Sequence, residues 1–296
     1  MLTLQAPQES LTVFTPLGIR FWDPVRDTPV RDHLVVTARP EGVQGRVTSA
    51  FRTVSGLYAF QGLPGLHEVE YPSEANAGAP SSVRTRRFLI EVIDRLDRFL
   101  PVLFRVELPL SYRGVFSLMP QNRGLAAGEL SRFFLFSAPT RLASSGLAAV
   151  RAQLVDATTG QPAAYALMEL QVNGSTWYGV SDAEGGIAVL FPYPTFTSAL
   201  LTSPPGMGRV SQSLQHWEMT IRVRYEPLAL TFPVGSAIPD LRSIVMQAPG
   251  GIRPTQLHSP LSAPVAAWPQ ELLFGQELIL RTDDLSTLWI QMAASS

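Results

Sequence analysis

The sequence feature that most constrains the fold is a segment that occurs twice along the chain. An apolar strand, a turn opened by aspartate, a proline and a second apolar strand occur near residue 20 and again near residue 153. Asp23 and Pro29 hold the same places in the first copy as Asp156 and Pro162 in the second. Aspartate suits such a turn because its side chain accepts a hydrogen bond from the backbone two residues on. We therefore expect one strand–turn–strand unit to be built twice.

The two copies of this turn differ at one backbone position. Gly160 supplies a place where a positive φ costs little. Asp27 stands there in the first copy, and aspartate is a tolerated but less common residue at positive φ. We therefore expect both residues to adopt positive φ.

Further matches between the two halves occur in the same order. They are 55–60 with 185–190, then Pro64 with Pro194, and, more weakly, 88–92 with 219–223. Matching blocks in one order indicate an internal duplication.

The residues between these landmarks indicate strands. The chain contains 25 prolines and 22 glycines spread along its length, and the interior of a long helix tolerates neither. Residues 220–225 alternate apolar and charged side chains, which is the pattern of a half-buried strand. Many short strands between turn signals predict an all-β fold of two tandem sandwich-type domains.

One segment allows two interpretations. The apolar residues between 88 and 100 also fit the stripe of an amphipathic helix that Pro101 would end. The repeat favours a strand, a turn at 94–97 and a second strand. We predict the strands.

The domain boundaries are set by the repeat and by composition. The first sandwich covers 1–118, a connecting segment covers 119–145 and the second sandwich covers 146–246. Residues 247–296 begin Pro-, Gly- and Ser-rich and end in a strand, so they predict an extended C-terminal arm. Such an arm packs back on its own body or adds to the sheet edge of a neighbour.

Composition excludes several classes of function. The formal net charge is -1, and a nucleic-acid surface needs clustered positive charge. There is no cysteine and no lysine, which removes disulfides, thiol chemistry and lysine catalysis. The start of the chain has no signal-peptide pattern, and no apolar run is long enough to span a bilayer. We expect a cytoplasmic protein with no membrane span and no nucleic-acid partner.

A search for chemistry finds no catalytic, cofactor or metal site, so we expect that the chain is not an enzyme. His33, His67, His216 and His258 lack metal-ligand spacing, and no nucleophile elbow or phosphate loop is present. The segment from Asp182 to Gly186 is interpreted as a turn. A weak calcium site using Asp182 and Glu184 is the alternative, although too few oxygen ligands can be named.

Aromatic residues provide the remaining candidates. We expect Trp217 in a sandwich core, which is also the commoner fate for Trp177. Trp177 and Tyr178 would be the ligand platform if the protein were a carbohydrate- or surface-binding module. Candidate partner contacts lie in the C-terminal segment, because tryptophan is enriched at binding hot spots; they are Trp268, Phe274, Leu278, Leu280 and Trp289.

The second copy resembles a known module. Leu-Val-Asp-Ala-Thr-Thr-Gly-Gln-Pro at 154–162, followed by Ser-Asp-Ala-Glu-Gly-Gly at 181–186, resembles the carboxypeptidase regulatory-like (transthyretin-like) β-sandwich repeats. The first copy departs from the pattern at Asp27 and at 53–56, where Thr-Val-Ser-Gly replaces the Ser-Asp turn. The resemblance implies a non-catalytic β-sandwich.

The overall layout also resembles components of extracellular phage-tail-like contractile injection systems. The phrases that carry this resemblance lie at 55–66, 133–141 and 273–276. It implies a structural or assembly subunit at a baseplate or accessory position, with other protein subunits as partners. The sequence leaves the oligomeric state open.

Overall fold

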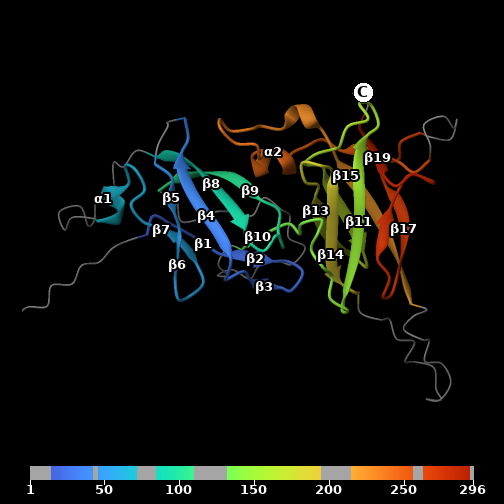
Figure 1. Cartoon of the computed structure of the whole chain (residues 1–296), viewed down its shortest axis with the longest axis horizontal. Helices are drawn as coiled ribbons and strands as arrows, with labels where there is room; N and C mark the ends of the chain where they lie inside the picture. Colours follow the sequence, from blue (N-terminus) through green and yellow to red (C-terminus); the bar gives the residue numbers. More distant parts are fainter. Residues whose placement is uncertain are drawn as a thin grey trace, which may run out of the picture.

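The structure is a computed structural model that describes residues 15–42, 46–71, 85–109, 132–194, 215–255 and 263–293. Within these residues the chain is an all-β, sandwich-type protein. Figure 1 shows two β-bodies side by side, the first in blue to teal and the second in green to red. Short helices occur at His67–Glu70 (α1), Pro227–Ala229 (a 3-10 turn) and Leu241–Val245 (α2).

The first sandwich packs one four-stranded sheet against two three-stranded sheets. The four-stranded sheet has the order β5-β4-β8-β9, and the others have the orders β1-β7-β6 and β10-β2-β3. The strands are β1 Leu17–Ile19, β2 Phe21–Asp23, β3 Thr28–Pro29, β4 Leu34–Pro40, β5 Thr48–Ser49, β6 Phe51–Arg52, β7 Tyr58–Phe60, β8 Arg86–Asp94, β9 Val102–Leu108 and β10 Phe133–Phe134. Phe21, Phe60 and Phe88 are fully buried in the core between these layers, which we call the first core.

The strand interpretation of residues 88–100 is confirmed. β8 and β9 form an antiparallel hairpin in which Phe88 faces Val106 and Val92 faces Val102. Its turn is closed by Asp94, which accepts backbone hydrogen bonds from Leu96 and Arg98. The apolar residues fit a helical stripe by coincidence. They are the inward-facing residues of two strands, which a turn separates.

The second sandwich packs two sheets around its own core. One sheet has the order β13-β12-β15-β17; the other has the order β14-β11-β19-β16, with β18 also paired to β11. The strands are β11 Leu147–Asp156, β12 Leu167–Val172, β13 Ser175–Val180, β14 Gly186–Pro192, β15 His216–Arg224, β16 Gly250–Arg253, β17 Trp268–Leu273, β18 Leu278–Leu280 and β19 Leu288–Met292. Leu154, Leu170, Phe191 and Ile221 are fully buried in this second core.

The C-terminal segment packs back on its own body, which was one of the two outcomes left open. β17 pairs with β15, and β19 lies between β11 and β16. The segment expected as an arm therefore supplies strands to both sheets of the second sandwich. Similarly, β10 of the expected connecting segment pairs with β2 of the first sandwich.

The two Asp-led turns have the same local geometry. Asp23 Oδ1 accepts from the Val25 N–H at 3.0 Å, and Asp156 Oδ1 accepts from the Thr158 N–H at 2.9 Å. The expected positive φ is confirmed at both positions, with 50° at Asp27 and 69° at Gly160.

The second pair of turns corrects the sequence alignment by one residue. The N–H of Thr53 donates to the carbonyl of Leu57, and the N–H of Asp182 donates to the carbonyl of Gly186, both at 2.8 Å. The glycine with φ of 81° is Gly56 in one turn and Gly185 in the other. The alignment of Ser55 with Gly185 was therefore wrong, because matching by apolar pattern missed the glycine conformation.

The two four-stranded sheets also share one topology. In each, the second strand in the order lies antiparallel to the third, and the third is antiparallel to the last (β4-β8-β9 and β12-β15-β17). The parallel pairing of β10 with β2 likewise has a counterpart in β19 with β11. These correspondences support the internal duplication, which remains a hypothesis about the origin of the chain.

Candidate functional site

The two aromatic residues expected to form a ligand platform lie on opposite faces of one sheet. Trp177 and Tyr178 are neighbours on β13, and successive side chains of a strand alternate between its faces. Trp177 stacks on Phe191 in the second core with ring centroids 5.7 Å apart, whereas Tyr178 packs against the first core. The platform expectation is corrected, because neighbouring residues on a strand cannot present two rings to one ligand.

The residues expected to contact a partner pack mainly within the second sandwich. Leu280 is 1% exposed and Trp268, Phe274 and Leu278 pack against the second core. Phe274 meets Tyr193 with ring centroids 4.7 Å apart. Trp289 lies on the central strand β19, half-buried, with its indole N–H donating to Thr287. These side chains stabilise the sandwich, and Leu280 has no surface left for a partner.

The polar residues considered as ligands from sequence form turns or lie apart. Asp182 Oδ1 accepts the N–H groups of Glu184 and Gly186, which confirms the turn interpretation. His33 and His216 are exposed, His67 begins α1, and His258 lies outside the described residues. Among the described residues, no group of three or more His, Asp or Glu side chains is placed to hold a metal ion. Trp217 is 7% exposed, as expected of a core residue.

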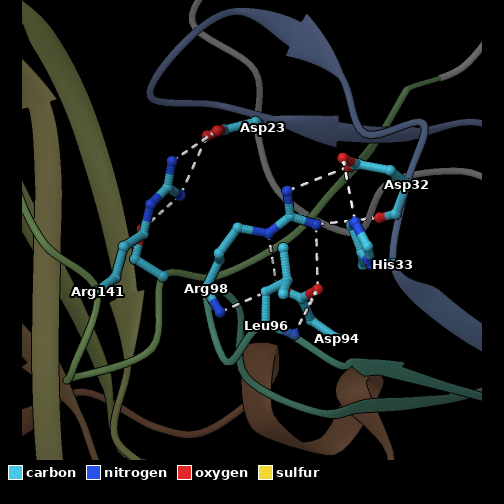
Figure 2. A network of polar contacts seen from close by, with 8 residues as sticks. Asp23, Asp32, His33, Asp94, Leu96, Arg98 and Arg141 are labelled. Carbon is cyan, nitrogen blue, oxygen red and sulfur yellow. Dashed lines mark hydrogen bonds and ion pairs between the residues drawn. The ribbon is translucent and has the colours of Figure 1, made fainter.

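A buried ion pair joins the first sandwich to the segment that leads into the second. This linking segment comprises residues 137–146. Arg141 donates from its two terminal guanidinium nitrogens to Asp23, at 2.6 and 3.2 Å, and also to Ser137. Both charged side chains are 7% exposed. Figure 2 shows the guanidinium of Arg141 facing the carboxylate of Asp23. A bidentate pair of this kind fixes orientation as well as distance.

A second arginine lies beside the first pair. Arg98 donates to both oxygens of Asp94, at 2.9 and 3.0 Å, and also reaches Asp32 (Figure 2). Burial alone would raise the pKa of Asp94, but hydrogen bonds from Arg98 and from the backbone outweigh it and lower that pKa. The same bond to Asp94 raises the pKa of Arg98. The guanidinium groups of Arg98 and Arg141 lie 5.5 and 4.8 Å from the ring centre of Phe99.

The hollow beside these pairs has a volume of about 480 Å³. Arg98 and Arg141 both line it, and carboxylates already engage both guanidinium groups. The arrangement therefore holds chain segments together and leaves these cations little capacity for an anionic ligand.

The second sandwich holds the linking segment from its other side. Arg151 on β11 donates to the backbone carbonyls of Pro139 and Arg141 and pairs with Glu277. Val25, from the Asp23 turn, packs on the outer face of β11 and β14 against Ala149 and neighbouring residues. The linking segment is thus anchored to both sandwiches.

A strap from the second sandwich also covers the first. We use this name for residues 226–246, which come after β15 and include α2; Figure 1 shows α2 in orange above the junction of the two bodies. Asp240 forms a bridge with Leu103 of β9, and Arg105 of β9 donates to Asp240 and, at 2.6 Å, to Glu41. The bond to Glu41 is the main cause of a raised pKa for Arg105.

The strap inserts apolar side chains into the first core. Leu241, Ile244 and Val245 pack there, together with Leu167 and Val180 from the second sandwich. The first core therefore continues across the junction of the two bodies. Sequence reasoning missed the strap, although one signal was present: the segment between β15 and β17 has no counterpart between β8 and β9.

The outer surface of the strap is apolar. Leu228 is 89% exposed, Val234 is 91% exposed and Phe232 is 49% exposed. Isolated exposed apolar residues are ordinary, but a group in one segment marks a candidate interaction surface.

No helix in the described part of the chain is long and apolar enough to cross a membrane. No protein-family model matches the chain, and no curated protein matches it. A solved structure, the C-terminal fragment of the pilus adhesin SpaC from Lactobacillus rhamnosus GG, aligns with 95% of this chain and 100% of its own. The identity is 11% and the TM-score 0.21, which is too low to carry an inference about fold or function.

Proposed function

We propose that the protein is a non-enzymatic structural subunit that acts as a rigid connector in a larger protein assembly. The observation that carries the proposal is the junction, where one apolar core includes side chains from both sandwiches and from the strap. A connector must transmit position from one end to the other, so its domains need fixed relative orientation. An ordinary interface between domains permits relative motion unless it is large and hydrophobic.

The polar contacts at the junction support the same proposal. Asp23–Arg141 and Asp240–Arg105 join residues far apart in the sequence, and each includes a carboxylate at most 7% exposed. Buried pairs contribute little net stability compared with apolar replacements, but they penalise alternative arrangements in which one partner is left alone. We infer that they specify one orientation of the two sandwiches.

The finer proposal is that the assembly is a phage-tail-like contractile injection particle, with this subunit at a baseplate or accessory position. Its support is the resemblance of the segments at 55–66, 133–141 and 273–276. The exposed apolar residues of the strap provide a surface on which a neighbouring subunit can pack.

The structure guides the choice of variant that tests this function. Deletion of residues 247–296 would remove β16 to β19 and unfold the second sandwich, so it cannot separate docking from folding. A better variant replaces Leu228 and Val234 with serine, because these side chains are 89% and 91% exposed and belong to neither core. Phe232 is kept, because its ring packs against Tyr165, which contacts the first core. Leu142→Ser, at a residue 89% exposed on the linking segment, is the matched control.

The measurement is mass spectrometry and electron microscopy of the high-molecular-mass fraction from the native host expressing tagged protein. We expect the wild type and the Leu142→Ser control at fixed stoichiometry in one particle, and the strap variant in the monomer fraction. Wild-type protein found only as a free monomer contradicts a structural role. Normal incorporation of the strap variant contradicts the strap as the docking surface.

A further inference from the structure

A pocket of about 220 Å³ lies where the two sandwiches and the strap meet. Each of the three parts contributes to its wall. Its lining comprises Leu100, Pro101, Val102, Leu103 and Phe136 of the first sandwich, Tyr165, Val180, Ser181, Asp182 and Ala183 of the second, and Ile238, Pro239, Leu241 and Ile244 of the strap. Pockets at the interface between domains are a common place for small ligands. We call it the junction pocket.

The lining is mostly hydrocarbon, and two of its three polar side chains already have partners. The Ser181 hydroxyl donates to Ala163 at 2.7 Å, and the Tyr165 hydroxyl donates to Ala237 at 3.1 Å. Asp182 is the third. Asp182 is half-buried, and its Oδ1 closes its own turn. Its Oδ2 lies near Gly186 and Pro139 and accepts none of the hydrogen bonds formed among the described residues.

Asp182 and Tyr165 both line the pocket, and the charge of Asp182 acts on the Tyr165 phenol. Burial is the main cause of a raised pKa for Tyr165, and the negative charge of Asp182 is the other. Tyr165 also adopts a positive φ of 57°, which is uncommon for an aromatic residue. Backbone outliers of this kind cluster at ligand sites, and this one holds an aromatic ring in the pocket wall.

The volume limits the size of a ligand. An engineered apolar cavity of about 150 Å³ in another protein binds benzene, so a pocket somewhat larger has room for one ring and a short substituent. The atoms that line an empty pocket lack van der Waals contacts on that side, and an apolar ligand would supply them.

We propose that the junction pocket binds a small organic cation, whose single aromatic or branched aliphatic group fills the apolar space while its ammonium group meets Asp182 Oδ2. The ligand would contact both sandwiches and the strap at once. Binding would therefore stabilise their relative orientation, because a ligand that binds only the assembled junction favours that state.

The test uses three probes of similar shape and different charge on the full chain: phenethylamine, 2-phenylethanol and phenylacetate. Isothermal titration calorimetry measures their affinities. We expect phenethylamine to bind about tenfold more tightly than 2-phenylethanol, as a hydrogen bond to a charged group implies. Phenylacetate should give no saturable heat, because its carboxylate would face Asp182.

Two variants test the location of the binding site, and a third is a control. Asp182→Asn retains an acceptor for the turn and removes the charge, so it should abolish the preference for phenethylamine over 2-phenylethanol. Ala183→Phe, at an exposed residue of the pocket rim, should abolish binding of both probes without touching Asp182. Asp284→Asn removes one exposed carboxylate elsewhere and should leave all affinities unchanged.

Circular dichroism of each variant confirms that it is folded before titration. The proposal is overturned if no probe gives saturable binding, if phenylacetate binds as tightly as phenethylamine, or if folded Ala183→Phe binds phenethylamine like the wild type. Because it concerns the pocket alone, its failure leaves the connector function untouched.

Discussion

The Asp-led turns of the two sandwiches show how one local structure serves two purposes. Asp156 binds the N–H of Thr158 and the Thr159 hydroxyl at 3.1 Å and lies beside the Tyr225 phenol, so all these groups lie in its own sandwich. Asp23 makes the same backbone bond within its turn, but Arg141 of the linking segment takes its remaining capacity. The Asp156 turn thus makes contacts only within the second sandwich. The equivalent Asp23 turn ties the first sandwich to the linking segment.

The connections between equivalent strands also differ, because one stays within its sandwich and the other reaches across to the neighbouring one. A short turn joins β8 to β9, whereas the strap and β16 lie between β15 and β17. The strap reaches across to β9 through Asp240. The two sandwiches are thus alike where each builds its own core, and they differ where they meet.

The largest effect should come from replacing the two equivalent aspartates. Asp23→Ala leaves the Arg141 guanidinium buried without its carboxylate, so we expect it to lower the free energy of unfolding by about 3–5 kcal/mol. Asp156→Ala removes hydrogen bonds to neutral groups only, so we expect it to lower the free energy of unfolding by roughly 1–3 kcal/mol. Guanidinium chloride denaturation followed by circular dichroism measures both. Equal losses would mean that the two turns have the same role.

A smaller effect should occur at the strap. Asp240→Ala removes the ion pair with Arg105 and the side-chain cap of α2, and we expect a loss of about 1–3 kcal/mol. Arg87→Ala is the control, since its pair with Glu107 lies exposed on the same sheet and should contribute nothing measurable. If both variants unfold at the same denaturant concentration, the strap does not hold the sandwiches together.

Gly160, the positive-φ residue of the Asp156 turn, should show a cost that comes from backbone conformation alone. Gly160→Ala places a Cβ where no atom lies within 4 Å, so its expected loss of about 1–2 kcal/mol comes from backbone strain alone. Gly146→Ala, with equally open space and no positive φ, should be neutral or slightly stabilising. Thermal unfolding of the two variants makes the comparison. A Gly160→Ala variant as stable as Gly146→Ala would show that this turn tolerates strain.

The smallest expected effect is a change in stability at alkaline pH that depends on Tyr225, which lies beside Asp156. Burial, the charge of Asp156 and their hydrogen bond raise the pKa of Tyr225 to about 12. The unfolded chain ionises this group near pH ~10, so its stabilisation is complete below that pH and is lost as the pH rises through 12. Tyr225→Phe should cost roughly 0.5–1.5 kcal/mol at neutral pH.

The pH dependence tests the raised pKa of Tyr225, of which burial is the main cause. Between pH 10 and pH 12 the wild type should lose more stability than Tyr225→Phe, because only the wild type carries the linked ionisation. Urea unfolding at a series of pH values measures the two slopes. Parallel slopes would show that folding does not raise the pKa of Tyr225.

The local part of this architecture could be predicted from sequence. Turn chemistry is set by residues close together, so the positive φ of Asp27 and Gly160 and the hairpin after Asp94 could be inferred from spacing alone. The apolar alternation on 220–225 likewise identified β15.

The contacts that define the candidate site could not be predicted in this way. Arg141 pairs with a residue 118 positions earlier and Asp240 with one 135 positions earlier, and no periodic pattern specifies such partners. Trp177 and Tyr178 show the opposite error: side chains adjacent in sequence lie on opposite faces of a strand. Leu280 looked available because β11, the strand with which it pairs, lies far back in the sequence.

The most direct test of the rigid connector is differential scanning calorimetry of the wild-type chain. If the two sandwiches share one core across the junction, they unfold together, and the calorimetric and van't Hoff enthalpies agree in one transition. Asp23→Ala should split this transition, because it loosens the joint while leaving the second sandwich intact. Two independent transitions in the wild type would contradict the account, since they would show that each sandwich is stable without the other.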